Sequence, residues 1–241
     1  MANRPVFLVS QDDSINEFVE KKDIEFQWFP GFSQKQKQKS IKSLHESIIR
    51  EISDANILEI SSKSTAELGV KLSAFNLMIT HKNTKQTFSV ESAFQSSKVF
   101  EKGGPYRDIL NMNSREAKKD KRLKNSGDLK YFDFFNTKWG LNPKTLFYDW
   151  LYINALWQNK NLIKEVIKYN AFTDIEFNPS KSINCQANAA ALFVSLFNKG
   201  LLEKALNSIE DYINIVVSND KQKEIANIKE ERYQQITFKD L

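Results

Sequence analysis

Three polar side chains within eight residues could act together on a glycosidic bond: Glu91, Gln95 and Lys98. If residues 90–98 open an amphipathic helix, a rotation of 100° per residue puts Glu91 and Lys98 within about 20° of each other, with Gln95 beside them. The neighbouring apolar face would comprise Val90, Ala93, Phe94 and Phe100. The spacing predicts a carboxylate, an amide and an amine at the border between core and surface, a set suited to acid–base and covalent catalysis. The same pair is also typical of an exposed ion pair on a helix, which contributes about 0.3–0.5 kcal/mol.

Other chemistries find little support in the sequence. No phosphate-binding glycine loop, dinucleotide-binding fingerprint or nucleophile elbow is present. His45, His81 and the single Cys185 do not form a zinc-binding pattern, so neither a metal nor another cofactor is expected. His45 follows Leu44 on an amphipathic segment and is interpreted as a structural or surface residue.

Composition favours an α+β, predominantly α-helical fold. The 241 residues are 41% apolar and contain only 7 Gly and 5 Pro, which argues against an all-β sandwich. One cysteine rules out an internal disulfide and fits a reducing compartment. Because no signal peptide or membrane-spanning run is visible, we expect a cytoplasmic protein with no membrane partner.

The elements that must position the polar residues follow from periodicity. Ser89 is the expected N-cap of the helix that begins at Glu91, and Gly103-Gly104-Pro105 is expected to end it. Strands are predicted at 5–9, 24–29, 57–60, 77–80 and 87–90, the last two as a hairpin. Helices are predicted at 39–52, 65–71, 114–124, 146–157, 162–169 and 184–198, followed by a last helix to about 217. Residues 172–182 are interpreted as a polar loop and 218–241 as a charged, loosely packed tail.

Positive charge is concentrated in two stretches of a chain whose net charge is +5. One lies within residues 34–50 and the other within 115–130, and together they could flank a phosphate-bearing groove. Solvated helix faces are the alternative interpretation of such runs. The candidate DNA-phosphate contacts are Lys35, Lys37, Lys39, Arg115, Lys118, Lys119 and Arg122.

The segment from Glu91 to Lys98 resembles the NADAR superfamily, small and mostly helical proteins that cleave N-glycosidic bonds. Ser73-Ala74-Phe75-Asn76 and Ser182-Ile183-Asn184-Cys185-Gln186-Ala187 resemble two further elements of that superfamily. The whole chain is more similar to one branch, the NADAR antitoxins encoded beside DarT-type DNA ADP-ribosyltransferase toxins. The stretches that carry this similarity are Trp28-Phe29-Pro30-Gly31-Phe32, Gln36-Lys37-Gln38-Lys39, Gly103-Gly104-Pro105, Phe147 to Tyr152 and Phe172 to Pro179.

The resemblance covers about residues 2 to 217 and implies one NADAR-like domain at 1–217, with residues 1–60 as a branch-specific extension packed on it. It implies removal of ADP-ribose from guanine in DNA, expected to be single-stranded, with ADP-ribose as product and the cognate toxin as a further partner. Glu91 would be the catalytic carboxylate and Lys98 an amine that traps the opened ribose as a Schiff base. A lysine within Gln36 to Lys39 is the alternative amine.

Substrate binding is expected to involve Phe75, Asn76, Gln95, Asp174, Glu176, Asn184 and Trp150. Residues 182–186 could present helix N–H groups to a pyrophosphate, or cap that helix only. Trp139, Tyr148 and Trp150 are either stacking residues or core. An Asp-x-x-Trp-Gly-like element of the wider superfamily is missing after Thr173, where Asp174 and Glu176 lie instead. Two other functions remain open: a non-catalytic antitoxin that binds the toxin directly, and an N-glycosidase acting on a riboflavin-pathway metabolite.

Overall fold

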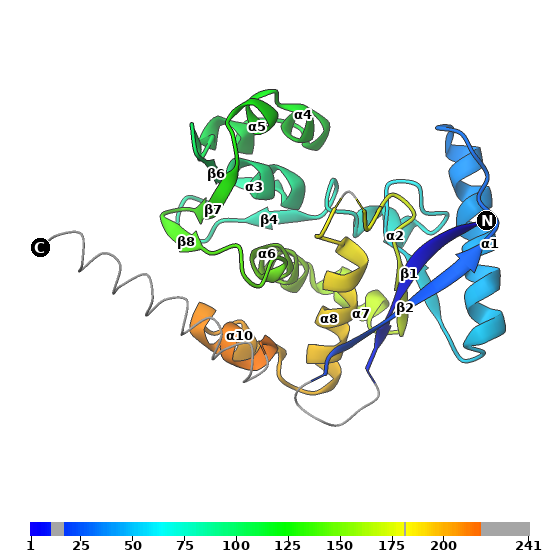
Figure 1. Cartoon of the computed structure of the whole chain (residues 1–241). Helices are drawn as coiled ribbons and strands as arrows, with labels where there is room; N and C mark the ends of the chain where they lie inside the picture. Colours follow the sequence, from blue (N-terminus) through cyan, green and yellow to red (C-terminus); the bar gives the residue numbers. More distant parts are fainter. Residues whose placement is uncertain (11–16, 181, 218–241) are drawn as a thin grey trace, which may run out of the picture.

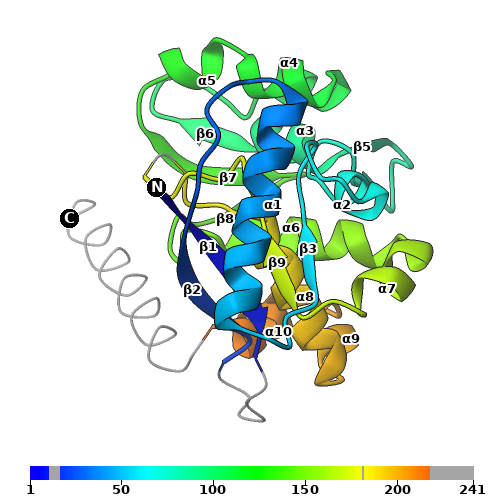
Figure 2. The ribbon, with the colours of Figure 1, turned by 90° about the vertical axis from the view of Figure 1, so that its right-hand side faces the viewer.

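A four-stranded sheet in the order β2-β1-β9-β3 separates helix α1 from helix α8 (Figures 1 and 2). The computed structural model describes residues 1–10, 17–180 and 182–217, and the predicted tail at 218–241 lies outside them. β1 pairs antiparallel with β2 and β9, whereas β3 runs parallel to β9. In Figure 2, α1 crosses the near face of this sheet and α8 lies behind it.

The bounds of the elements are as follows. The strands of the main sheet are β1 (Ala2–Val9), β2 (Val19–Phe26), β3 (Ile57–Glu59) and β9 (Ala171–Thr173). The shorter strands are β4 (Met78–Thr80), β5 (Thr87–Ser89), β6 (Lys98–Phe100), β7 (Leu129–Phe134) and β8 (Thr137–Trp139). The helices are α1 (Gln34–Glu51), α2 (Glu67–Lys71), α3 (Val90–Ser96), the 3-10 helix η1 (Arg107–Asn111), α4 (Ser114–Lys119), α5 (Arg122–Asn125), α6 (Leu146–Trp157), α7 (Lys160–Val166), α8 (Gln186–Asn198), α9 (Leu202–Ala205) and α10 (Ile209–Val216).

Side chains of β1 alternate between two hydrophobic clusters, as the two-residue period of a strand requires. Val6 belongs to the smaller cluster, which lies between the sheet and α1 and includes Leu44 and Ile48 of that helix. Phe7 and Val9 belong to the larger cluster, which includes residues of α8 and α6. The sheet is therefore apolar on both faces and joins the two clusters.

Helix α6 lies at the centre of the larger cluster and is seen end-on in Figure 1. It contacts α8, α3 and β4, and Leu151, Tyr152 and Ile153 are fully buried on it. The mixed α+β, helix-rich fold expected from the sequence is confirmed. Among the described residues, none of the helices combines the length and hydropathy that a membrane crossing requires.

The predicted helix from Glu91 toward Gly103 is wrong beyond its second turn. The Oγ atoms of Ser96 and Ser97 both donate hydrogen bonds to the carbonyl of Ala93, and α3 ends at Ser96. Lys98 then begins β6, in register with Phe132 of β7. Serine side chains that bond back to the backbone compete with helix propagation, and the β-branched and aromatic residues that follow suit a strand.

Three further differences concern strands and the basic segment. The predicted loop at 172–182 begins inside β9, which is buried because it pairs with β1 and β3. The hairpin of β7 and β8 was not predicted; it turns at Phe135 and Asn136, both at positive φ. The predicted basic helix at 114–124 is two helices, α4 and α5, separated at Asp120. The assignment of residues 1–60 as a branch-specific extension stays a prediction.

Candidate active site

A cleft of about 430 Å³ brings together side chains from α3, β6, α4, α6 and the segments on either side of residue 180. It contains both predicted catalytic residues and most of the predicted substrate-binding residues. The lining residues named below are Phe75, Glu91, Phe94, Gln95, Lys98, Lys118, Tyr148, Asp174, Glu176, Asn184 and Gln186.

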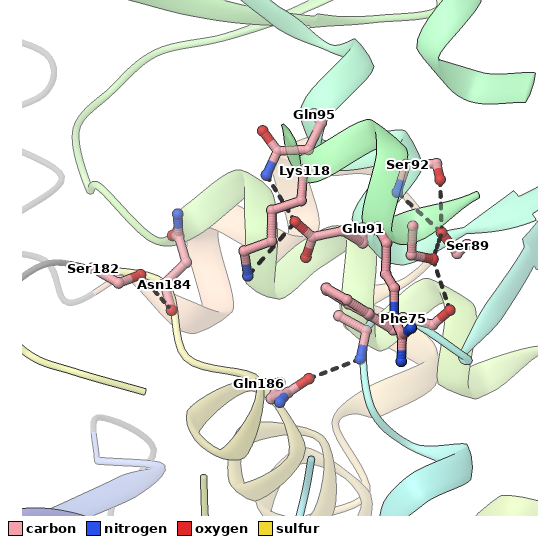
Figure 3. A network of polar contacts seen from close by, with 12 residues as sticks. Phe75, Ser89, Glu91, Ser92, Gln95, Lys118, Ser182, Asn184 and Gln186 are labelled. Atoms are coloured by element: carbon pink, nitrogen blue, oxygen red, sulfur yellow. Dashed lines mark hydrogen bonds and ion pairs between the residues drawn. The ribbon is translucent and has the colours of Figure 1, made fainter. Parts of the chain in front are cut away.

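Glu91 enters the cleft from the first turn of α3 and is only 5% exposed. The helix begins as predicted at Ser89, whose Oγ accepts a hydrogen bond from the Ser92 N–H. Glu91 Oε1 accepts a 2.8 Å hydrogen bond from Gln95 Nε2 and lies 3.9 Å from Lys118 Nζ (Figure 3). The carboxylate of Glu91 thus lies at a helix N-terminus and contacts both an amide donor and a cation.

Lys98 reaches the same cleft from the strand that follows. Its Nζ lies 4.8 Å from the centre of the Phe94 ring. Burial lowers the pKa of Lys98 to about 8, the charge of Glu91 opposes that change and the charge of Lys118 adds to it. The ion pair of Glu91 is with Lys118, so the predicted Glu91–Lys98 pair on one helix edge is corrected. About a tenth of an amine with this pKa is neutral at pH 7, far more than of an ordinary lysine.

Gln186, the first residue of α8, connects three segments at the floor of the cleft. Its Oε1 accepts from the Ala74 N–H at 2.7 Å. Figure 3 draws this hydrogen bond as the dashed line from Gln186. Its Nε2 donates to the Ile60 carbonyl and to Asp174 Oδ2 at 2.7 and 2.9 Å. Because one amide holds the chain at three places, the spacing between these walls depends on it.

Asp174 is buried at this floor beside a second buried carboxyl, Glu59 of β3. Burial, together with the charge of Glu59, raises the pKa of Asp174 to about 8. Burial also raises the pKa of Glu59, whose oxygens accept from the Ile175 N–H and the Thr173 hydroxyl. Thr173 Oγ1 in turn lies 2.9 Å from His45 Nε2, which gives His45 a structural contact. A protonated Asp174 can donate a hydrogen bond into the cleft.

Two predicted substrate-binding residues do not line the cleft. Asn76 donates its side-chain N–H groups to the Val70 carbonyl of α2 and to Ser73 Oγ. Trp150 packs on Trp139, with ring centres 4.9 Å apart, in the larger cluster. Tyr148 faces the cleft, and residues two positions apart on a helix differ by about 200°, which turns Trp150 away.

The predicted DNA contacts fall into three groups. Lys118 lines the cleft, and Lys37 forms an ion pair with Glu176. Arg122 is held by Asp108 and Asp120 at 2.6 and 2.7 Å, so its charge is already compensated. The remaining four are exposed on α1 or α4 and form no ion pair within the described part of the chain: Lys35, Lys39, Arg115 and Lys119.

Sequence reasoning missed the roles of Lys118 and Gln186 within the site. Lys118 was one of many cations in a basic run, and nothing in that run distinguishes the one that reaches Glu91. Gln186 had a weak signal, a long polar side chain at the start of an apolar, Ala-rich helix. Among the described residues, no group of three His, Cys, Asp or Glu side chains could hold a metal ion.

Comparison with known families gives one result. The family described as DarT1-associated NADAR antitoxin matches residues 2–226 of this chain. No curated protein matches the chain.

Proposed function

The chain belongs to the DarT1-associated NADAR antitoxin family, and from this premise we propose that it hydrolyses the N-glycosidic bond of ADP-ribosylated guanine in DNA. Removing ADP-ribose would restore the base and undo the toxin's lesion. The observation that carries the proposal is the cleft in which Glu91, Gln95, Lys98 and Lys118 meet. A negative carboxylate beside an amine of lowered pKa is a set suited to cleaving a glycosidic bond.

Glu91 is the proposed catalytic carboxylate. The ribose carbon that loses its guanine passes through a state with oxocarbenium character, which a nearby negative charge stabilises. The hydrogen bond from Gln95 and the ion pair with Lys118 orient Oε1. Glu91 can also carry a proton between the attacking and the leaving nitrogen.

Lys98 is the proposed nucleophile, and the step balances as follows. The neutral amine adds to the ribose C1 while the bond from C1 to the guanine nitrogen breaks, and the proton lost by the amine passes through Glu91 to that nitrogen. The ribose ring opens to leave a Schiff base between Lys98 and C1. Water then hydrolyses the Schiff base, which releases ADP-ribose and regenerates the amine.

The start of α8 is the proposed site for the pyrophosphate of ADP-ribose. Helix N–H groups there are free of helical partners and favour anions. Asn184 precedes this helix on the cleft wall, and its Oδ1 is buried without a hydrogen-bond partner in the described structure. That oxygen would accept a hydrogen bond from a ribose hydroxyl of the substrate.

A time course on a single-stranded oligonucleotide that carries one ADP-ribosylated guanine tests the proposal. We expect wild type to restore the unmodified oligonucleotide and Glu91→Ala to lose at least about 100-fold in rate. Glu67→Gln is the matched control, because this exposed carboxylate pairs with Lys71 outside the cleft. No restoration by folded wild-type protein would contradict the proposal.

Borohydride trapping tests the covalent step. Reduction during turnover should link ADP-ribose to the protein, detected as a mass increase on the peptide that contains Lys98. The expected yield falls to background in Lys98→Ala, because a Schiff base needs the amine. An adduct of undiminished yield in Lys98→Ala would remove Lys98 from this role and favour a lysine near residue 37.

Family membership also supports a direct-binding antitoxin as the second candidate function. In that case the chain would protect by contact with its cognate toxin, without turnover. Co-purification with the toxin and full protection by Glu91→Ala would favour it over the glycohydrolase.

A further inference from the structure

Two cations lie over one tryptophan beside the cleft. The Arg4 guanidinium carbon is 5.4 Å, and Lys37 Nζ is 4.9 Å, from the centre of the Trp28 ring. These three residues come from β1, the segment after β2, and α1. None of them lines the cleft itself, so the proposed chemistry leaves them without a function.

The group is joined to the cleft through Glu176. Lys37 Nζ lies 3.0 Å from Glu176 Oε1, and Glu176 lines the cleft. Arg4 feels the charges of both Asp174 and Glu176, which partly oppose the effect of burial in lowering its pKa. The two cations therefore lie one side chain away from the cleft.

The two cations are only partly compensated. Arg4 Nε is buried and has no hydrogen-bond partner in the described structure, and Nη1 donates only to the neighbouring Asn3 carbonyl. Within residues 1–10, 17–180 and 182–217, Glu176 is the one carboxylate that pairs with Lys37. α1 also carries no acidic residue in its first turn, where the helix dipole favours negative side chains. Of the two acids that act on Arg4, Asp174 has a pKa of about 8 and is mostly protonated at neutral pH, so Glu176 is left facing two cations and the excess of positive charge indicates an anionic ligand.

We propose that Arg4 and Lys37, aligned on Trp28, bind a backbone phosphate of the nucleotide next to the modified guanine. This subsite rests on the proposed glycohydrolase function and adds recognition of the neighbouring nucleotide to recognition of the modified base. A free ADP-ribosylated nucleoside has no such neighbouring phosphate. The group would therefore select polymeric substrate over small metabolites, because only a strand can use both the cleft and the cation pair.

Glu176 competes with the phosphate for Lys37. Binding of the strand requires Lys37 to exchange its carboxylate partner for a phosphate, which explains why the pair lies at the rim of the cleft, where Glu176 is 42% exposed. Removing the charge of Lys37 should therefore weaken binding of the strand, whereas removing the charge of Glu176 should strengthen it. An ion pair lying well away from the bound strand would change affinity only slightly in either variant, because its field is screened by salt.

Binding of an unmodified single-stranded oligonucleotide, followed by fluorescence anisotropy over a salt series, is the first test. Lys37→Gln and Arg4→Gln should each weaken binding and reduce the slope of log affinity against log salt by about 0.7, the value for one phosphate contact. Glu176→Gln should strengthen binding. Lys160→Gln is the matched control, because Lys160 lies 3.3 Å from the centre of Trp157, on α7 and outside the cleft lining.

The alternative source of phosphate is the pyrophosphate of ADP-ribose. If Arg4 and Lys37 held that pyrophosphate, Lys37→Gln would weaken the binding of free ADP-ribose as much as the binding of the oligonucleotide. That result would overturn the proposal. Unchanged slopes in Lys37→Gln, or weaker binding in Glu176→Gln, would overturn it as well. A melting curve identifies any variant that has not folded, and Lys37→Gln, or Glu176→Gln at a side chain that is 42% exposed, remains decisive if Arg4→Gln does not fold.

The second test compares kcat/KM on the modified oligonucleotide and on free ADP-ribosylated guanosine. We expect the preference for the oligonucleotide to fall about tenfold in Lys37→Gln. An unchanged preference would overturn the proposal. If wild type hydrolyses neither substrate, the glycohydrolase function fails, whereas the anisotropy series still decides the phosphate subsite.

Discussion

Lys118 organises the charges of the cleft without lying near Lys98 in sequence. Its Nζ takes the ion pair with Glu91, and its charge helps to lower the pKa of Lys98. A carboxylate paired directly with Lys98 would hold that amine in its charged form, which cannot act as a nucleophile. Burial does most to lower the pKa of Lys98, and the exposed Lys118 adds to this effect while it pairs with Glu91.

This arrangement predicts the pH dependence of the reaction. Because the proposed nucleophile is the neutral amine of Lys98, whose pKa is about 8, kcat/KM should rise about tenfold per pH unit from pH 6 and level off above about 8. Lys118→Gln removes a cation that lowers this pKa, so the rise should move to higher pH. A rate independent of pH between 6 and 8, measured under single-turnover conditions, would contradict the role of Lys98.

The site residues show how far sequence reasoning reaches at this scale. The spacing of Glu91 and Lys98 predicted that the two side chains lie close together, and both line one cleft. The predicted geometry was wrong, because the chain leaves the helix at Ser96 and continues as a strand. A continuous helix and the observed helix followed by a strand both leave the side chains of Glu91 and Lys98 on the same side of the molecule. Lys118 and Gln186 were missed because their contacts join segments distant in sequence, which no local pattern records.

At the scale of elements, the N-terminus of α3 positions Glu91. Ser89 Oγ caps the helix and also bonds to the hydroxyls of Ser92 and Ser114, at 2.9 and 2.8 Å. Ser89→Ala should lower the free energy of unfolding by about 1–2 kcal/mol and reduce kcat with it. Ser33→Ala removes the exposed cap of α1 and is the control. If urea unfolding gave an equal loss of unfolding free energy in both variants, Ser89 would have no special role.

Asp149 makes the packing of α6 against α8 depend on pH. Burial raises its pKa to about 7, and Oδ1 has no hydrogen-bond partner in the described structure. The folded state therefore keeps a proton that the unfolded state loses above about pH 4, and stability falls as pH rises from about 4 to about 7. Asp149→Asn should be neutral near pH 4 and stabilising by up to about 4 kcal/mol at pH 8. The exposed Asp128→Asn controls for net charge, and parallel pH profiles of wild type and Asp149→Asn would refute the assignment.

Elements with strong periodicity were predictable and those made by pairing were not. The apolar spacing of α1, α6 and α8 indicated three helices near their observed positions. β9 was predicted as part of a polar loop because three residues are too few to show the two-residue alternation of a strand. These residues form a strand because they pair with β1 and β3. The β7–β8 hairpin lacks glycine at its turn, where Phe135 and Asn136 adopt positive φ, so the usual signal for a turn was missing.

At the scale of the whole molecule, exposed cations on α1 and α4 should both contribute to DNA affinity. We expect Lys35→Gln with Lys39→Gln, and Arg115→Gln with Lys119→Gln, each to reduce the salt slope for single-stranded DNA by up to about 1.4. Arg122→Gln should change it less, because two aspartates already compensate that charge. If the DNA affinity of wild type did not depend on salt concentration, neither helix would contact phosphate.

The sheet order β2-β1-β9-β3 has a consequence for synthesis of the chain. β9 pairs with strands made more than a hundred residues earlier, and the segment after it supplies Asp174 and Gln186. While the protein emerges from a ribosome, β1 and β3 cannot join one sheet until β9, which lies between them, has been made. The cleft is likewise incomplete until the first residue of α8 has been made. Activity should therefore appear abruptly and late in translation, and fragments ending before residue 171 should be inactive, with open strand edges prone to association.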